Sequence, residues 1–142
     1  MNVSRRMVVT FGVSAIATIV AAPLAVAQSA GSAALPARTN DAGGVRVVIT
    51  PKAVTAKSDW EFTVTMDTHT KPLDDDLTKT AVLLDDGGRK YMPLSWQGDK
   101  PGGHHRKGVL RLPAPSGKIE TFELQIQGLG GESKRVFQWT MK

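Results

Sequence analysis

Residues 60–67 read WEFTVTMD and decide the fold class. Trp, Phe, Val and Met occupy every second position, and polar residues stand between them. Because successive side chains of a strand point to opposite faces of a sheet, this alternation predicts a strand with one buried face. No segment after residue 44 sustains a helical period over eleven residues, so the domain is predicted to contain strands only.

Similar alternation or short apolar runs recur on both sides of this strand, separated by turn residues such as Asp85-Asp86-Gly87-Gly88. The predicted strands run over residues 45–50, 60–67, 80–84, 89–96, 108–112, 119–127 and 135–141. Their number and spacing predict an all-β domain over residues 45–142, an antiparallel immunoglobulin-like sandwich of about seven strands. The predicted core comprises Trp60, Phe62, Val64, Val82, Leu84, Leu110, Phe122, Leu124, Ile126, Phe137 and Trp139.

Residues 1–27 have the composition of an export signal. Arg5 and Arg6 precede an apolar stretch that is expected to be helical, and a small-x-small cleavage site follows at Ala25-Val26-Ala27. The pair Arg5-Arg6 resembles a twin-arginine motif, although an ordinary basic region of the general secretory route fits equally well. We therefore expect a periplasmic or secreted protein with no stable membrane anchor after cleavage, the alternative being an uncleaved anchor.

Residues 28–44 (QSAGSAALPARTNDAGG) are rich in small residues and predict a flexible linker. The whole chain has 18 Lys+Arg against 13 Asp+Glu and a net charge of +5, and it contains no Cys. Cleavage would remove Arg5 and Arg6, which lowers the net charge to +3. The remaining basic residues are scattered, so no nucleic-acid partner is expected. The absence of Cys excludes disulfides and thiolate metal sites.

All three histidines lie in two polar segments, residues 67–77 and 96–106, together with five aspartates. Imidazole and carboxylate groups suit zinc or copper, and no thiolate competes with them here. This arrangement predicts a transition-metal site in an exported binding domain. The candidate ligands are His69, Asp74, Asp76, His104 and His105.

A metal-independent interpretation of the same segments stays open. Asp74–Asp76 also fits a solvated turn or a helix cap, and Trp96 fits either a core residue or a stacking platform. Arg106 could pair with an aspartate and hold the two segments together. The domain would then bind an exported protein or a glycan. No serine lies in a recognisable nucleophile motif, so enzymatic activity is not expected.

The runs DTHTKPLDDDL at residues 67–77 and WQGDKPGGHHRKGVL at residues 96–110 resemble a family of small exported bacterial β-sandwich proteins of unassigned function. The resemblance extends over about residues 45–139 and is most specific at Gly-Gly-His-His-Arg. It implies a shared site but no particular activity. The positions that match the family pattern are His69, Asp74, Asp76, Trp96, His104, His105 and Arg106.

Overall fold

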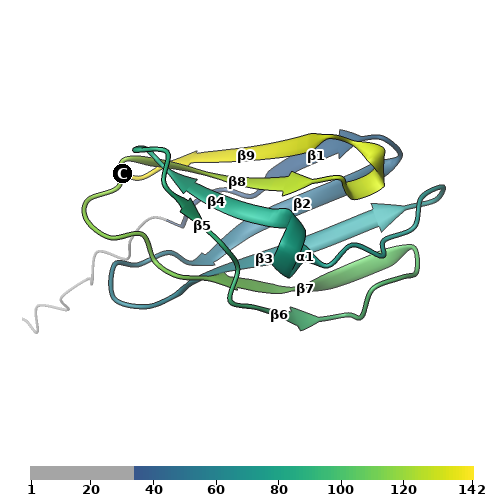
Figure 1. Cartoon of the computed structure of the whole chain (residues 1–142), viewed down its shortest axis with the longest axis horizontal. Coiled ribbons are helices and arrows are strands. Elements are labelled where there is room, and N and C mark those ends of the chain that lie inside the picture. Colours follow the sequence, from purple (N-terminus) through teal and green to yellow (C-terminus); the bar gives the residue numbers. More distant parts are fainter. Residues whose placement is uncertain (1–33) are drawn as a thin grey trace, which may run out of the picture.

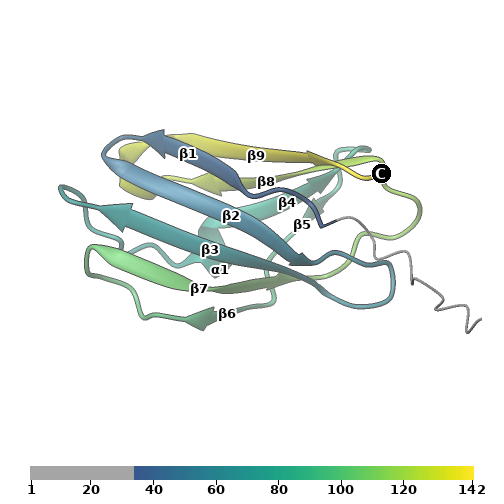
Figure 2. The same cartoon turned by 180° about the vertical axis from the view of Figure 1, so that it is seen from behind.

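The computed structural model describes residues 34–142 of the chain, which form two packed antiparallel sheets (Figures 1 and 2). The predicted export signal and residues 28–33 of the predicted linker lie outside this part. One sheet has the order β1-β2-β3-β7-β6 and the other β5-β4-β8-β9. The strands are β1 (Arg38–Ala42), β2 (Val45–Ala53), β3 (Trp60–Thr68), β4 (Ala81–Asp85), β5 (Lys90–Tyr91), β6 (Ser95–Gly98), β7 (His105–Leu112), β8 (Thr121–Gln127) and β9 (Lys134–Thr140). The predicted all-β sandwich is confirmed.

The core lies between the two sheets and is centred on four aromatic rings. Trp60 and Phe62 extend from β3, and Phe122 and Trp139 extend from β8 and β9 of the opposite sheet. The Trp60 and Phe122 ring centroids lie 4.8 Å apart, and those of Phe122 and Trp139 lie 5.3 Å apart. Full burial of such side chains contributes about 1.5–3 kcal/mol each, so this layer can stabilise a domain without disulfides.

The prediction of a flexible linker over residues 28–44 is wrong for residues 38–42. These residues form β1, which pairs along its whole length with β2. Sequence periodicity does not reveal this strand because β1 lies at a sheet edge and its side chains are mostly exposed. Its position is fixed from the other sheet, where the buried guanidinium of Arg135 donates to Asn40 Oδ1 at 2.6 Å.

The predicted strand over residues 89–96 is two strands in different sheets. Residues 90–91 form β5 beside β4, and residues 95–98 form β6 beside β7. Pro93 lies between them and has no backbone N–H to donate to a ladder, so pairing is interrupted there. At the β5–β6 connection the chain crosses from one sheet to the other, as it also does between β3 and β4 and between β7 and β8 (Figure 1).

The face of β4 that enters the core also differs from the prediction. Leu83 is fully buried in the core cluster, whereas Leu84 is only half-buried. Residues 81–84 read AVLL, so both faces of this strand are apolar and alternation cannot tell which face is buried. Val82, on the same face as Leu84, is buried but lies outside the core cluster.

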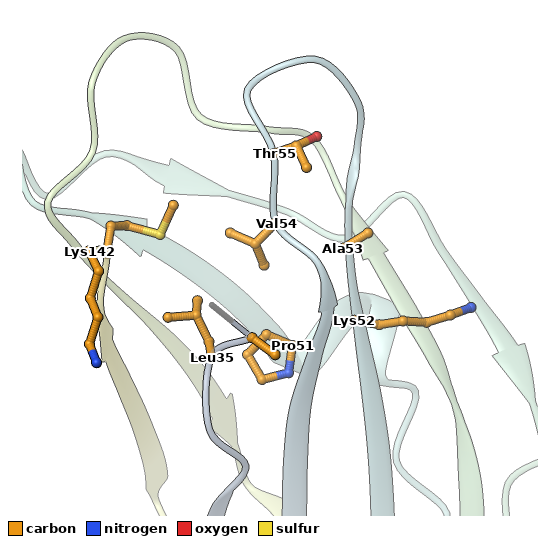
Figure 3. A pocket seen from close by; sticks show the side chains of 9 residues that line it. Leu35, Pro51, Lys52, Ala53, Val54, Thr55 and Lys142 are labelled. Carbon is orange, nitrogen blue, oxygen red and sulfur yellow. The ribbon is translucent and has the colours of Figure 1, made fainter. Parts of the chain in front are cut away.

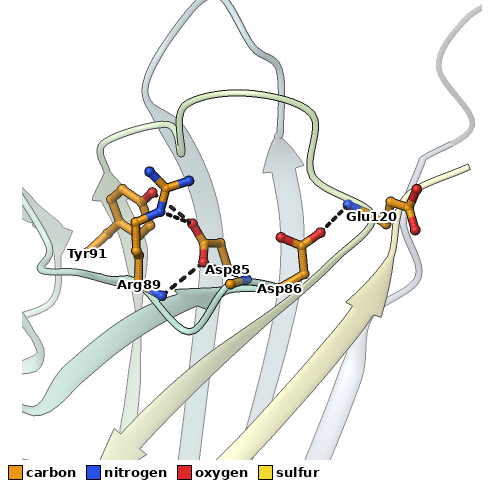
Figure 4. A network of polar contacts seen from close by, with 6 residues as sticks. Asp85, Asp86, Arg89, Tyr91 and Glu120 are labelled. Carbon is orange, nitrogen blue, oxygen red and sulfur yellow. Dashed lines mark hydrogen bonds and ion pairs between the residues drawn. The ribbon is translucent and has the colours of Figure 1, made fainter.

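The β4–β5 hairpin is closed by one carboxylate (Figure 4). Asp85 Oδ1 accepts hydrogen bonds from the backbone amides of Gly87 and Arg89, both at 2.9 Å. Its Oδ2 accepts from the Tyr91 hydroxyl at 2.9 Å and from Arg89 Nε at 3.1 Å. Burial opposes ionisation of Asp85, but these hydrogen bonds and the nearby Arg89 charge outweigh it and lower its pKa.

We predict that Leu83→Ala lowers the free energy of unfolding by about 2–5 kcal/mol, the range for emptying a core site. Leu84→Ala removes the same atoms from a half-buried position and should cost clearly less. Urea denaturation followed by tryptophan fluorescence measures both values. Equal losses from the two variants would contradict the assignment of the buried face.

We predict that the Asp85 carboxylate makes the free energy of unfolding depend on pH in the acid range. Because its pKa is lower in the folded chain than in the unfolded one, its contribution is complete above the unfolded value of about 3.9 and is lost as the pH falls through the folded value. Asp85→Asn should therefore flatten the decline in the free energy of unfolding at acid pH. Denaturation curves between about pH 6 and pH 2 test this, and parallel declines in both proteins would refute it.

Candidate functional site

The two polar segments meet at one end of the sandwich, where β3 ends and β7 begins. We call this region, residues 67–76 and 99–106, the loop end (Figures 1 and 2). The strands β3 and β7 are antiparallel neighbours, and Asp67 is the register partner of His105. Pairing of the strands therefore brings together segments that are more than twenty residues apart in the sequence.

Arg106 holds the loop end together. It is 2% exposed, and its Nη1 donates to the carbonyl oxygens of Leu73 at 3.1 Å and Asp75 at 2.6 Å. Its Nε donates to the carbonyl oxygen of Asp99 at 3.2 Å. The sequence suggested that Arg106 would pair with an aspartate side chain, but its hydrogen-bond partners are backbone carbonyls. One guanidinium thus connects both loops to β7.

Burial lowers the pKa of Arg106, and the surrounding carboxylates act in the opposite direction. The four carboxylates that favour its charged form belong to Asp75, Asp76, Asp99 and Asp74. A guanidinium keeps its proton in proteins, so the buried group is a cation that needs its hydrogen-bond acceptors. The aspartate-rich composition of these loops is thereby explained in part by the charge at their centre.

Further hydrogen bonds fix the loops on either side of Arg106. Thr68 donates its backbone N–H to the His104 carbonyl at 2.9 Å, and its hydroxyl accepts from the amides of Thr70 and Lys71. The Thr68 hydroxyl also donates to the Gly44 carbonyl at 2.8 Å. Thr68 is itself buried, so it ties the β3 end to the turn that follows and to the opposite loop.

Trp96 is a structural residue in this arrangement. It is half-buried against the core, and its Nε1 donates to the Asp99 carbonyl at 2.9 Å. The guanidinium of Arg106 lies over its ring, and the distance from Arg106 Cζ to the ring centroid is 5.2 Å. The ring also lies close to Gly108, where an added Cβ would be 2.5 Å from Trp96 Cζ2. These contacts support the interpretation of Trp96 as a core residue.

Asp76 is the N-cap of the short helix α1 (Leu77–Thr80). Its Oδ1 accepts from the backbone amide of Thr78 at 3.0 Å and from the Thr78 hydroxyl at 2.6 Å. These hydrogen bonds lower the pKa of Asp76. The cap fits the alternative interpretation from the sequence, and it commits this carboxylate to α1.

His69, Asp74 and His104 line one shallow hollow of about 360 Å³, together with Lys71. All four residues are exposed. The structure therefore brings three of the five predicted ligand residues to the same depression.

His105 lies in β7 and has a partner of its own. Its Nδ1 donates to Asp67 Oδ1 at 2.6 Å, and its ring centroid is 6.5 Å from that of His69. Asp67 was not among the predicted ligands. The only sequence signal for this pair is the register between β3 and β7, which requires knowledge of how the strands pair.

Within residues 34–142, no three His, Asp or Glu side chains are grouped closely enough to hold a metal ion. The predicted shell of His69, Asp74, Asp76, His104 and His105 is thus distributed over three places. These are the α1 cap, the hollow and the Asp67–His105 pair.

A second hollow lies at the opposite end of the sandwich (Figure 3). It has a volume of about 340 Å³ and an apolar lining that includes Leu35, Val54 and Met141. The side chain of Lys52 extends away from it in Figure 3. It contains none of the histidines and is separate from the loop end.

No protein-family model, curated protein or solved structure matches this chain. In the part of the chain from residue 34 onward, no helix has the length and hydrophobicity needed to cross a membrane.

We predict that Arg106→Met destabilises the domain by about 1–3 kcal/mol, the cost of leaving a buried polar group without a partner. The Asp75 carbonyl would lose its donor, whereas the Leu73 carbonyl would keep the Gly102 amide and the Asp99 carbonyl would keep Trp96 Nε1. Arg46→Met is the matched control, because Arg46 is exposed on β2 and its replacement should have little effect. Thermal and urea denaturation measure both variants. A loss at Arg106 no larger than at Arg46 would contradict the role given to the buried guanidinium.

Proposed function

We propose that this protein is an exported, non-catalytic binding domain that takes its ligand at the loop end. The observation that carries this proposal is the buried Arg106, which holds the loops in a fixed shape. Binding residues are commonly placed on loops that a rigid scaffold positions. Here the scaffold is the sandwich, and the loops present imidazole, carboxylate and ammonium groups to solvent.

The groups around the hollow suit a polar ligand. His69, Lys71, Asp74 and His104 supply both hydrogen-bond donors and acceptors over a short distance. Their exposure means that a ligand could reach them without displacing the core. The hollow is shallow, which suits the surface of a larger partner better than an enclosed small molecule.

The arrangement of the histidines favours binding over catalysis. An activated nucleophile needs a hydroxyl within hydrogen-bond reach of a base. Across residues 34–142, the hydrogen bonds of serine and threonine hydroxyls include none to a histidine ring. The one side-chain partner of a histidine ring in this part of the chain is Asp67.

A metal-independent interaction with an exported protein or a glycan is the alternative to binding of a transition metal. In that case residues 102–106 would serve to hold the loops. The observation that favours it is the set of backbone contacts made by this segment, including Gly102 N–H to the Leu73 carbonyl at 2.9 Å. Under either alternative, the ligand contacts lie at the same end of the molecule.

Site-specific photo-cross-linking in the producing cells tests the proposal. A photoreactive phenylalanine analogue replaces Thr70, which lines the hollow, or Lys57, which is exposed in the β2–β3 turn at the opposite end. We expect discrete adducts from position 70 and none from position 57. His69→Ala/His104→Ala should reduce those adducts. A glycan array, probed with wild type and this double variant, serves as the second arm.

The proposal fails if positions 70 and 57 give the same adducts, or if neither cross-linking nor the array detects binding that depends on the hollow. A variant that unfolds would lose binding in both the cross-linking experiment and the glycan array, whatever the role of the hollow. The double variant is therefore first compared with wild type by thermal denaturation, where exposed residues should cost little.

A further inference from the structure

We infer that His69 and His105 together form a two-imidazole site for a divalent transition metal ion, with Asp67 as the positioning carboxylate. The inference rests on the proposed function, since it assigns one ligand class to the loop end. It changes the ligand set expected from the sequence, because Asp74, Asp76 and His104 are not part of it.

The first ligand is oriented by a carboxylate on the neighbouring strand. Asp67 in β3 is directly opposite His105 in β7, and the Nδ1–Oδ1 distance is 2.6 Å. When Nδ1 donates to a carboxylate, the lone pair available for a metal is on Nε2. Metal-binding histidines almost always make such a hydrogen bond with the other ring nitrogen, which fixes the ring and raises its basicity. The His105 side chain is 72% exposed, so Nε2 can be reached from solvent.

The second ligand is held close by the turn that follows β3. The His69 and His105 ring centroids are 6.5 Å apart, and their planes are at 88°. Two nitrogens on one metal ion can be at most about 4.2 Å apart, twice the metal–nitrogen bond length. Because the rings are edge to face in this structure, the His69 ring must turn toward His105 for one ion to reach a nitrogen of each, and its side chain is exposed. Hydrogen bonds from the backbone amides of Thr70 and Lys71 to the Thr68 hydroxyl keep the turn in place.

The two imidazole ligands favour some divalent metal ions over others. Imidazole nitrogen suits Zn²⁺, Cu²⁺ and Ni²⁺, whereas Mg²⁺ and Ca²⁺ prefer oxygen ligands. In the described part of the chain, no three His, Asp or Glu side chains form a group that could hold a metal ion. Two protein ligands leave coordination positions for water or for a donor from a binding partner, as in sites that keep an open position.

The remaining candidate residues have other contacts. Asp76 caps α1, and His104 lines the hollow beside Asp74. His104 is exposed and adjacent to His105 in the sequence, but within residues 34–142 the Asp67 carboxylate makes its hydrogen bond to the His105 ring and not to the His104 ring. His104 is therefore a matched control for the removal of an imidazole.

Isothermal titration of the metal-free purified protein with ZnCl₂ and with CuCl₂ tests the inference. Wild type should bind one ion, and His69→Ala and His105→Ala should each weaken binding at least about tenfold, while His104→Ala should leave the affinity within about twofold. Asp67→Asn should weaken binding about 10–100-fold without removing a ligand, the usual effect of losing a carboxylate behind a metal-binding histidine. Thermal denaturation checks that every variant is folded.

The inference is overturned if folded wild type binds neither ion, or if His104→Ala weakens binding as much as His105→Ala. Unchanged affinity in Asp67→Asn would remove the positioning role of the carboxylate. The two proposals fail separately. Cross-linking at position 70 without metal binding would overturn only the metal site. Metal binding without cross-linking or glycan recognition would overturn the proposed interaction at the hollow and leave only the metal site.

Discussion

The guanidinium of Arg106 makes the hydrogen bonds on which the shape of the loop end depends. Three backbone carbonyls from two loops converge on this one side chain, and Trp96 covers it on one face. Leu73 anchors one loop in the core, but these loops contribute few other apolar side chains and therefore also need polar contacts that are protected from water. Arg106 supplies those contacts from β7, which is among the best-paired strands of its sheet.

Arg135 performs the same role at the same end of the opposite sheet. It is 1% exposed and donates to the carbonyls of Leu129, Val45 and Ala42, so it links β9 to β1 and β2 across the sandwich. Burial lowers the pKa of Arg135, as it does that of Arg106. Burying a cation is costly unless acceptors surround it. The chain has no cysteine, and these two buried cations join its segments through hydrogen bonds to backbone carbonyls.

Local alternation was enough to predict the sandwich, because residues 60–67 and 119–127 each present one continuous apolar face. Alternation was insufficient for strands that do not have one apolar and one polar face. Residues 38–42 are exposed on an edge, residues 81–84 are apolar on both faces, and Pro93 divides a run between two sheets. In each case tertiary pairing determines the structure, and a single sequence does not record which strands are neighbours.

The candidate site shows the same dependence on pairing. The sequence predicted that the histidines share one region, but which imidazole meets Asp67 is set by the β3–β7 register. A slip of one residue would exchange His105 for His104, because side chains alternate between faces. Beside β7, the register of β6 is constrained where Gly98 faces Gly108, since a Cβ on Gly98 would lie 2.3 Å from Gly108 Cα. These two glycines thus let β6 pair closely with β7, the strand that presents the oriented imidazole.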